Sequence, residues 1–141
     1  MTKEDKELLL KDLSARIPYG VKLLYNSNSI ANIKDRVEIL RGITIGYTIL
    51  FETDHIHSEY ESTIGSYEHF KPYLRPMSSM TDIEKKKYHL HICEIDSSGF
   101  NISKMSEMIG WLNSIYVDYN GLIPMGLALP APDGMYNTKN E

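Results

Sequence analysis

The chain has a single cysteine, so no disulfide can form within it. Its 15 Lys and Arg are outnumbered by 19 Asp and Glu, and it therefore lacks the broad positive field that general nucleic-acid binding needs. No apolar run approaches the roughly 20 residues that span a bilayer. The first seven residues carry no apolar stretch of the kind found in secretory signals. We therefore expect a cytoplasmic protein that binds neither membranes nor nucleic acids in general.

Signatures of catalysis and cofactor binding are also missing. The sequence has no Gly-x-Ser-x-Gly elbow, and Gly42-x-x-x-Gly46 lacks the Lys-Ser/Thr ending of a phosphate loop. Cys93 has no nearby Gly-rich turn or helix start of the kind that activates a thiol. We therefore expect no enzymatic activity and no cofactor.

What the sequence does have is an ordinary globular composition, with 42% hydrophobic and 24% charged residues, which predicts one folded domain over 1–141. The segment Lys71-Pro-Tyr-Leu-Arg-Pro-Met-Ser-Ser-Met-Thr81 divides it into two differently patterned halves. We predict an α+β fold with an N-terminal helix, a small SH3-like, partly open antiparallel β-barrel and a C-terminal helical segment. The predicted ranges are 3–17 for the helix, 20–76 for the barrel, 81–136 for the helical part and 137–141 for a frayed tail.

Alternating apolar residues dominate the first half. After a helix that Pro18 ends, Val21, Leu23 and Tyr25 predict a short strand. The run from Val37 to Phe51 is too long for one strand, so we expect two strands, or one strongly bent at Gly42 or Gly46. Asn26–Ser29 is expected to be a turn, 54–62 a polar stretch, and 66–70 one helical turn before a last strand at Tyr73-Leu74.

Helical spacing becomes more common in the second half. Thr81-Asp-Ile-Glu84 reads as a capping box that opens a short helix to about Leu90, after which His89–Ile95 alternates like a strand. Ser103–Tyr116 has apolar residues at i, i+3, i+4 and i+7 and predicts a helix. We expect Tyr119–Ile123 to form a short turn of helix and 126–135 to run extended over the surface.

Three blocks of the sequence resemble a family of short proteins abundant in gut Bacteroidetes genomes, their phages and other mobile elements. The blocks are residues 1–21, residues 71–81 and Asp118-Tyr-Asn-Gly-Leu-Ile-Pro-Met-Gly-Leu-Ala-Leu-Pro-Ala-Pro-Asp-Gly-Met-Tyr136, somewhat more than a third of the chain. That family has no assigned activity, so the resemblance implies a source and no mechanism. Relatives often carry paired histidines where this chain has Ile115 and Tyr116, and an arginine where it has Asn120. Apolar replacements favour a packing role there.

A metal site is the sharpest local possibility for chemistry. In a strand, His89, His91 and Cys93 would project from one face, and zinc accepts all three ligand types. Same-face neighbours on a strand lie about 6.5–7 Å apart, however, so three in a row rarely converge on one ion. In a helix, His89 and Cys93 would face together and His91 would not. His55 and His57 form a second cluster in a polar stretch.

The most favoured functional interpretation is a non-enzymatic interaction protein of a phage or mobile element, with a homodimer left open. Ten tyrosines suit either an interface or a partly sheltered core. The expected protein-binding surface comprises Trp111, Tyr116, Tyr119, Leu122 and Met125, with Leu127 and Leu129 also expected to be exposed. The alternative is a nucleotide-binding protein that uses aromatic residues and the basic residues Lys71, Arg75, Lys85, Lys86 and Lys87. A metal-dependent enzyme is the third interpretation.

Overall fold

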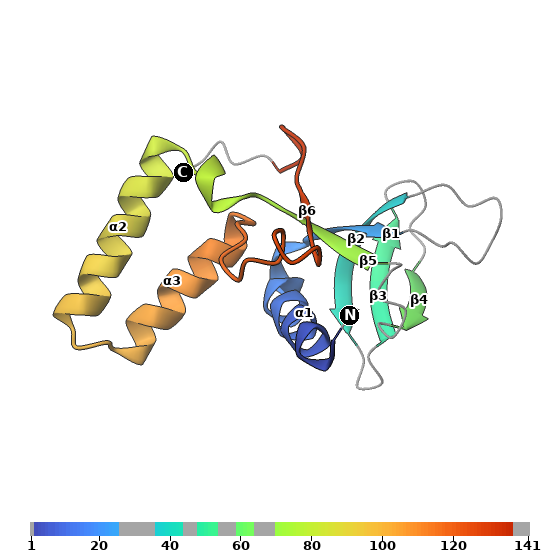
Figure 1. Ribbon diagram of the computed structural model, residues 1–141, viewed down its shortest axis with the longest axis horizontal. Coiled ribbons are helices and arrows are strands. Elements are labelled where there is room, and N and C mark those ends of the chain that lie inside the picture. The colour runs from blue at the N-terminus through green and yellow to red at the C-terminus, as the bar shows by residue number, and fades with distance from the viewer. Residues whose placement is uncertain (1, 26–35, 44–47, 54–58, 64–69, 137–141) are drawn as a thin grey trace.

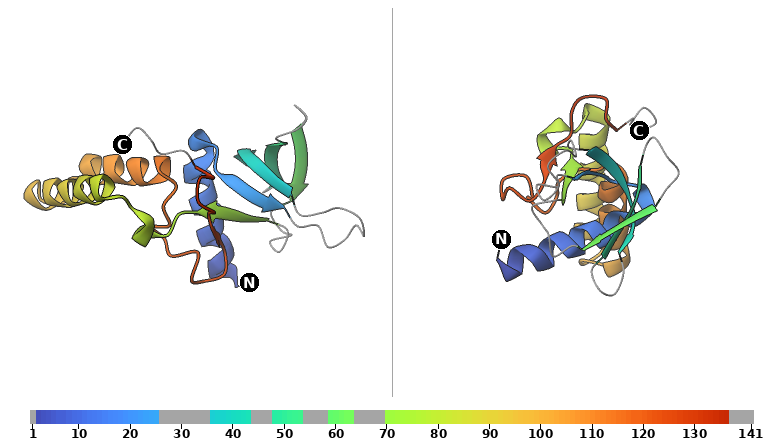
Figure 2. Two further views of the ribbon diagram at one scale, coloured as in Figure 1. Left: turned by 90° about the horizontal axis from the view of Figure 1, so that it is seen from above. Right: turned by 90° about the vertical axis from the view of Figure 1, so that its right-hand side faces the viewer.

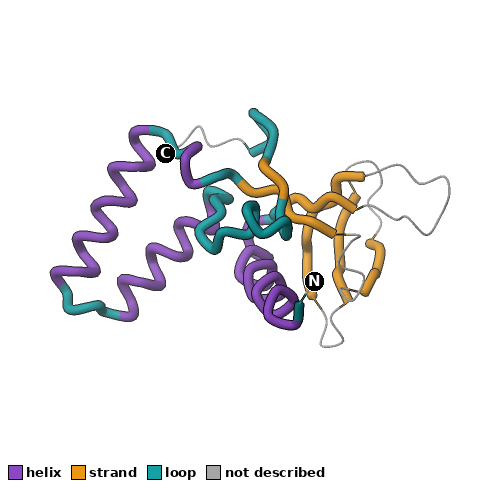
Figure 3. The backbone as a smooth tube through the Cα atoms, viewed as in Figure 1, coloured by secondary structure: helices purple, strands orange, loops and turns teal. Residues whose placement is uncertain are grey.

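The computed structural model of the protein describes residues 2–25, 36–43, 48–53, 59–63 and 70–136. Its architecture is α+β, as predicted from the sequence (Figures 1 and 3). The helices are α1 (Lys3–Arg16), α2 (Asp82–Ser97) and α3 (Ile102–Ser114), with the 3-10 turns η1 (Ile17–Tyr19) and η3 (Met77–Ser79). The strands are β1 (Lys22–Tyr25), β2 (Arg36–Ile43), β3 (Thr48–Thr53), β4 (Glu59–Thr63), β5 (Phe70–Leu74) and β6 (Leu129–Pro130).

Helix α1 begins and ends where the sequence predicts. The Thr2 hydroxyl accepts a hydrogen bond from the Asp5 amide, and the Asp5 carboxylate accepts one from the Thr2 amide, which closes a capping box. At the other end, Pro18 is the middle residue of the 3-10 turn η1, and Gly20 adopts a left-handed conformation with φ of 65°. The turn redirects the chain from the helix into β1.

The strands form one six-stranded sheet in the order β4-β3-β2-β1-β5-β6. Neighbours from β4 to β5 are antiparallel, with Lys22 opposite Ile39 and Leu23 opposite Pro72, whereas β5 and β6 run parallel. The strands from the predicted barrel range, β1 to β5, are antiparallel as expected, and the added parallel strand β6 makes the sheet mixed. Across the described strands the sheet is open rather than closed. The likeness to an SH3-type barrel stays a prediction.

The long alternating run does form two strands, β2 and β3. Pairing shifts register between Leu40 and Gly42, which is the irregularity expected at the glycine. The fully buried positions of β2 are Glu38 and Leu40, so the alternating Val37 and Ile39 lie on the other, half-buried face. Part of the predicted polar stretch is the strand β4. The predicted turn at 26–29, Gly46, His55, His57, the turn over 66–69 and the tail 137–141 lie outside the described residues.

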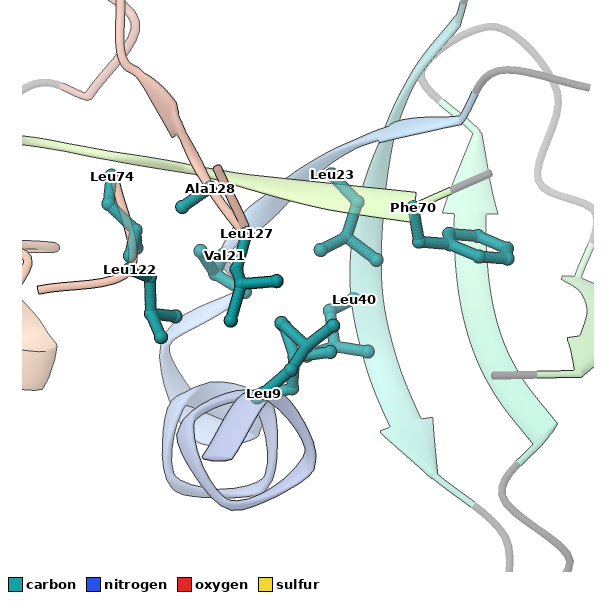
Figure 4. Packing of buried hydrophobic residues seen from close by; sticks show 10 residues of the cluster. Leu9, Val21, Leu23, Leu40, Phe70, Leu74, Leu122, Leu127 and Ala128 are labelled. Atoms are coloured by element: carbon teal, nitrogen blue, oxygen red, sulfur yellow. The ribbon is translucent and has the colours of Figure 1, made fainter. Parts of the chain in front are cut away.

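One apolar core joins α1, the sheet and the C-terminal segment (Figure 4). Leu9 and Leu13 of α1 pack with Val21, Leu23 and Leu40 of the β1–β2 region. The same core contains the following further residues: Phe70, Leu74, Leu122, Leu127 and Ala128. The C-terminal segment was expected to lie on the surface, but its apolar side chains are part of this core. That segment is held because the Asp118 carboxylate accepts hydrogen bonds from the Leu122 and Ile123 amides.

Helix α2 continues to Ser97, so the predicted strand over His89–Ile95 is wrong. Helix α2 contains no glycine or proline that would end it early. One face of the helix carries residues at i, i+4, i+7 and i+11, namely Glu84, Tyr88, His91 and Ile95. That face is the partly or fully buried one. The alternation over His89–Ile95 is therefore a short accidental pattern within a longer helical one.

Helices α2 and α3 form an antiparallel hairpin that projects away from the sheet, at the opposite end of the molecule from β4 (Figures 1 and 2). Asn101 caps α3 by accepting hydrogen bonds from the Ser103 and Lys104 amides. The predicted helix over Ser103–Tyr116 is confirmed within two residues, while Tyr119–Ile123 forms turns rather than helix. Within the described residues, no helix combines the length and the apolar character needed to cross a bilayer.

Candidate interaction surface

Arg75 fixes the base of the hairpin. Its guanidinium forms a bidentate ion pair with Glu84 at the start of α2, with N–O distances of 2.7 and 3.0 Å. It also donates to the backbone carbonyls of Ile115, at the end of α3, and of Ser79. The backbone of Arg75 pairs with Tyr116 and Asp118. One side chain therefore joins β5, η3 and both helices of the hairpin.

Stability should fall in acid through Glu84. The Arg75 guanidinium lowers the pKa of the Glu84 carboxyl below its ordinary value of 4.5. A lowered folded-state pKa adds stability above the unfolded-state value and loses it as the pH falls through the folded-state value. We expect Glu84→Gln to be less stable than the wild type at pH 7, with a difference that shrinks below pH 4.5. Urea unfolding of both proteins across pH 2–7 measures this, and a constant difference would contradict it.

A polar side of the hairpin is defined by contacts between α2 and α3. Lys87 lies 5.2 Å from the Trp111 ring centre, and the His91 ring stacks on Trp111 at 5.3 Å. Lys104 approaches Glu94 at 3.9 Å. Because Lys87, His91 and Glu94 follow one another at i, i+4 and i+7, they mark one side of α2.

The opposite side of the hairpin is apolar and lacks a covering element among the described residues. On α3, Ile102, Met105 and Ile109 follow at i, i+3 and i+7, away from Lys104 and Trp111. Ile92 lies on the corresponding side of α2. We call Ile92, Ile102, Met105 and Ile109 the apolar side. Their exposed fractions are 41%, 81%, 41% and 36%.

Phe100 extends this surface at the hairpin tip. It is 66% exposed and adopts a left-handed conformation with φ of 63°, next to Gly99 at 71°. Such a conformation is costly for a bulky side chain, on the order of 1 kcal/mol, and gains no burial here. The hairpin tip therefore presents an aromatic ring to solvent, in a turn that the Phe100 amide closes by donating to the Ile95 carbonyl.

The expected partner-binding residues lie mostly elsewhere. Trp111 is half-buried under Lys87 and His91, and Leu122 is fully buried in the core. The rings of Tyr116 and Tyr136 stack with centres 3.8 Å apart, and the Tyr119 hydroxyl donates to Asn113. Leu127 is buried, so the prediction that it is exposed is wrong, and Leu129 is half-buried. Met125, 47% exposed, is the member of the set that offers an open apolar side chain.

The basic residues proposed for nucleotide binding are not gathered into one site. Arg75 is neutralised by Glu84, and Lys87 is placed over Trp111. Lys85 and Lys86 line an open hollow on the outer surface of α2, together with His89 and Leu90. A second hollow of about 180 Å³ lies between Arg75–Ser79 and Ala131–Tyr136, and it contains the Asp133 carboxylate. Its charges do not favour a phosphate.

The predicted metal ligands do not converge. In α2, the Cys93 sulfur lies 3.6 Å from the His89 Nε2, as the helical alternative predicts, while His91 faces Trp111. Across the described residues, no group of three or more His, Cys, Asp or Glu side chains is placed to hold a metal ion. His89 and Cys93 remain an exposed pair on one helix.

Sequence reasoning did not single out Ile92, Phe100 or Ile102, and it used the apolar spacing that includes Met105 and Ile109 only to predict a helix. A signal was present. Helix α3 has two charged residues, Lys104 and Glu107, among thirteen positions. Its apolar residues occupy a wider arc than contact with one neighbouring helix can bury, which indicates a second contact.

No family model, curated protein or solved structure matches this chain. The resemblance drawn from the terminal and central sequence blocks therefore stays a prediction.

Proposed function

We propose that this protein is a non-enzymatic interaction module that binds a protein partner through the apolar side and tip of the α2–α3 hairpin. The supporting observation is the distribution of exposed apolar residues. Of eight large hydrophobic side chains exposed in the described residues, seven lie on this hairpin: five belong to the apolar side and Phe100, and two, Ile83 and Leu90, lie on the outer face of α2. The eighth, Met125, lies outside the hairpin. Large apolar patches of this kind mark interaction sites on soluble proteins.

The fold supports the same role. The core and the Arg75–Glu84 ion pair hold the hairpin by its base, which leaves both helices free along most of their length. An antiparallel helix pair with one uncovered apolar side is suited to dock against another helix. The nucleotide-binding alternative has less support, because Arg75 is already paired and Lys87 faces a different side of α2 from Lys85.

Two methionines with similar exposure provide a matched test of the proposed surface. Met105 lies on the apolar side and is 41% exposed, whereas Met125 lies outside the hairpin and is 47% exposed. We expect Met105→Glu to weaken partner capture from lysate at least tenfold, because it places a charge in a contact that excludes water. Met125→Glu should leave capture unchanged. Quantitative pulldown with the three immobilised proteins measures this, and equal capture by all three would refute the proposed surface.

A further inference from the structure

We propose that the partner of the apolar side is a second copy of this chain, packed antiparallel about a two-fold axis so that two hairpins form a four-helix bundle. The inference rests on the proposed function, since it uses the same surface. It follows from the arrangement of charges along that surface.

Two charges of opposite sign flank Ile92 along one stripe of α2. Lys85, Ile92 and Asp96 follow at i, i+7 and i+11, with Lys85 near the base of the hairpin and Asp96 near its tip. Both charged side chains are exposed, and neither is in an ion pair with another described residue. In an antiparallel dimer, Lys85 of each copy would lie opposite Asp96 of the other copy, which gives two ion pairs.

The two-fold axis that would form these two ion pairs passes through the middle of the hairpin. It crosses α2 midway between positions 85 and 96, close to Leu90 and His91, the middle of the helix. His91 stacks on Trp111 of α3, so Ile109, half a turn away, lies near the same level. Overlap of the two hairpins is then nearly complete, and apolar residues of α3 meet at the centre.

The extent of the apolar side and the net charge of the hairpin are also consistent with a second copy of this chain as the partner. The four residues of the apolar side and Phe100 are 36–81% exposed and form one patch of large side chains, which a polar rim would extend toward the ~800 Å² per partner of a standard interface. The hairpin is nearly neutral, so it does not call for a partner of strongly opposite charge. Its charged residues are four lysines and five acids: Lys85, Lys86, Lys87, Lys104, Asp82, Glu84, Glu94, Asp96 and Glu107.

Charge exchange tests this arrangement with the purified full-length chain. We expect the wild type to sediment as a dimer, and Lys85→Glu or Asp96→Lys alone to weaken dimerisation about tenfold, because each creates two like-charge contacts. An equimolar mixture of the two variants should regain an affinity within about twofold of the wild type, since both cross-copy pairs are then attractive. Lys86→Glu makes the same change in net charge off the stripe and should have no effect.

Sedimentation velocity over a range of protein concentrations gives these affinities. A wild type that is monomeric up to roughly 100 μM would overturn the dimer, as would a mixture no tighter than either variant alone. Those results would leave the proposed function intact if Met105→Glu still abolished capture of another protein. If Met105→Glu changed neither capture nor sedimentation, the apolar side itself would be refuted.

Discussion

Replacing Arg75 by alanine is expected to lower the free energy of unfolding by about 3–5 kcal/mol. The Glu84 side chain is fully buried, and its partner is 12% exposed, so alanine leaves a buried carboxylate without its counter-charge. The carbonyl of Ile115 loses its donor from the same guanidinium. We expect the hairpin to separate at a lower urea concentration than the rest of the fold unfolds, because these contacts join the two.

The single tryptophan makes the effect easy to follow. Trp111 fluorescence reports on the α2–α3 contact, while far-UV circular dichroism reports on the whole chain, so urea unfolding by both probes shows whether the hairpin separates early. Arg75→Lys keeps the charge without the bidentate geometry and should cost less, about 1–2 kcal/mol. The double variant Arg75→Ala/Glu84→Ala should cost less than the sum of the single changes. A loss below 1 kcal/mol for Arg75→Ala would contradict this account.

Asp12→Ala is expected to destabilise the protein by a similar amount, about 3–5 kcal/mol. Asp12 and Arg16 are both fully buried and are joined through two hydrogen bonds, at 2.7 and 3.2 Å. Arg16 also donates to the Val117 carbonyl, and the Asn120 amide donates to Asp12. Without Asp12, the Arg16 charge stays in the interior between α1 and the segment that follows α3.

Thermal unfolding measures this change, with an expected fall of about 10–15 °C in Tm. Glu7 provides the matched control on the same helix. It is 70% exposed and faces Lys3 at 4.0 Å, so Glu7→Ala should change stability by less than about 0.5 kcal/mol. Equal falls in Tm for Asp12→Ala and Glu7→Ala would show that the buried Asp12–Arg16 network stabilises the fold no more than an exposed ion pair does.

Local signals in the sequence were sufficient for the starts of α1 and α2 and for the end of α1, but not for the end of α2. The capping boxes at Thr2 and Thr81 identify the starts of α1 and α2, because a threonine followed by an acid three residues later satisfies two free amides. Pro18 identifies the end of α1 for an equally local reason. The apolar spacing of α3 is a strong helical signal, and the helix is there.

The predictions that were wrong or incomplete concerned features that depend on contacts between distant parts of the chain. The alternation at His89–Ile95 fits both a strand and a helix, and only packing against α3 decides between them. The segment with Leu122 and Leu127 reads as surface because it is rich in proline and glycine, yet Asp118 folds it back into the core. The candidate surface was missed because periodicity shows which residues share a face and not whether anything covers that face.

Under the proposed function, one part of the fold supplies stability and another part supplies the partner contact. The sheet, α1 and the C-terminal segment supply the core, and the tyrosine hydroxyls of Tyr116 and Tyr136 are used inside it, donating to the carbonyls of Tyr19 and Tyr73. The hairpin contributes little to that core beyond its base. Its inner apolar residues pack in a second cluster that includes Leu112 and Ile115, and the exposed residues of the apolar side are the ones that we propose for a partner contact.

Oxidative footprinting of the two matched methionines tests the central claim most directly. Met105 and Met125 have similar exposed fractions in the isolated chain and should be oxidised at similar rates in dilute purified protein. In a concentrated extract of cells that produce the protein, we predict that Met105 is protected while Met125 is not. Protection of Met105 would show that the apolar side is covered in its natural surroundings. Equal oxidation of both residues in both samples would contradict the account.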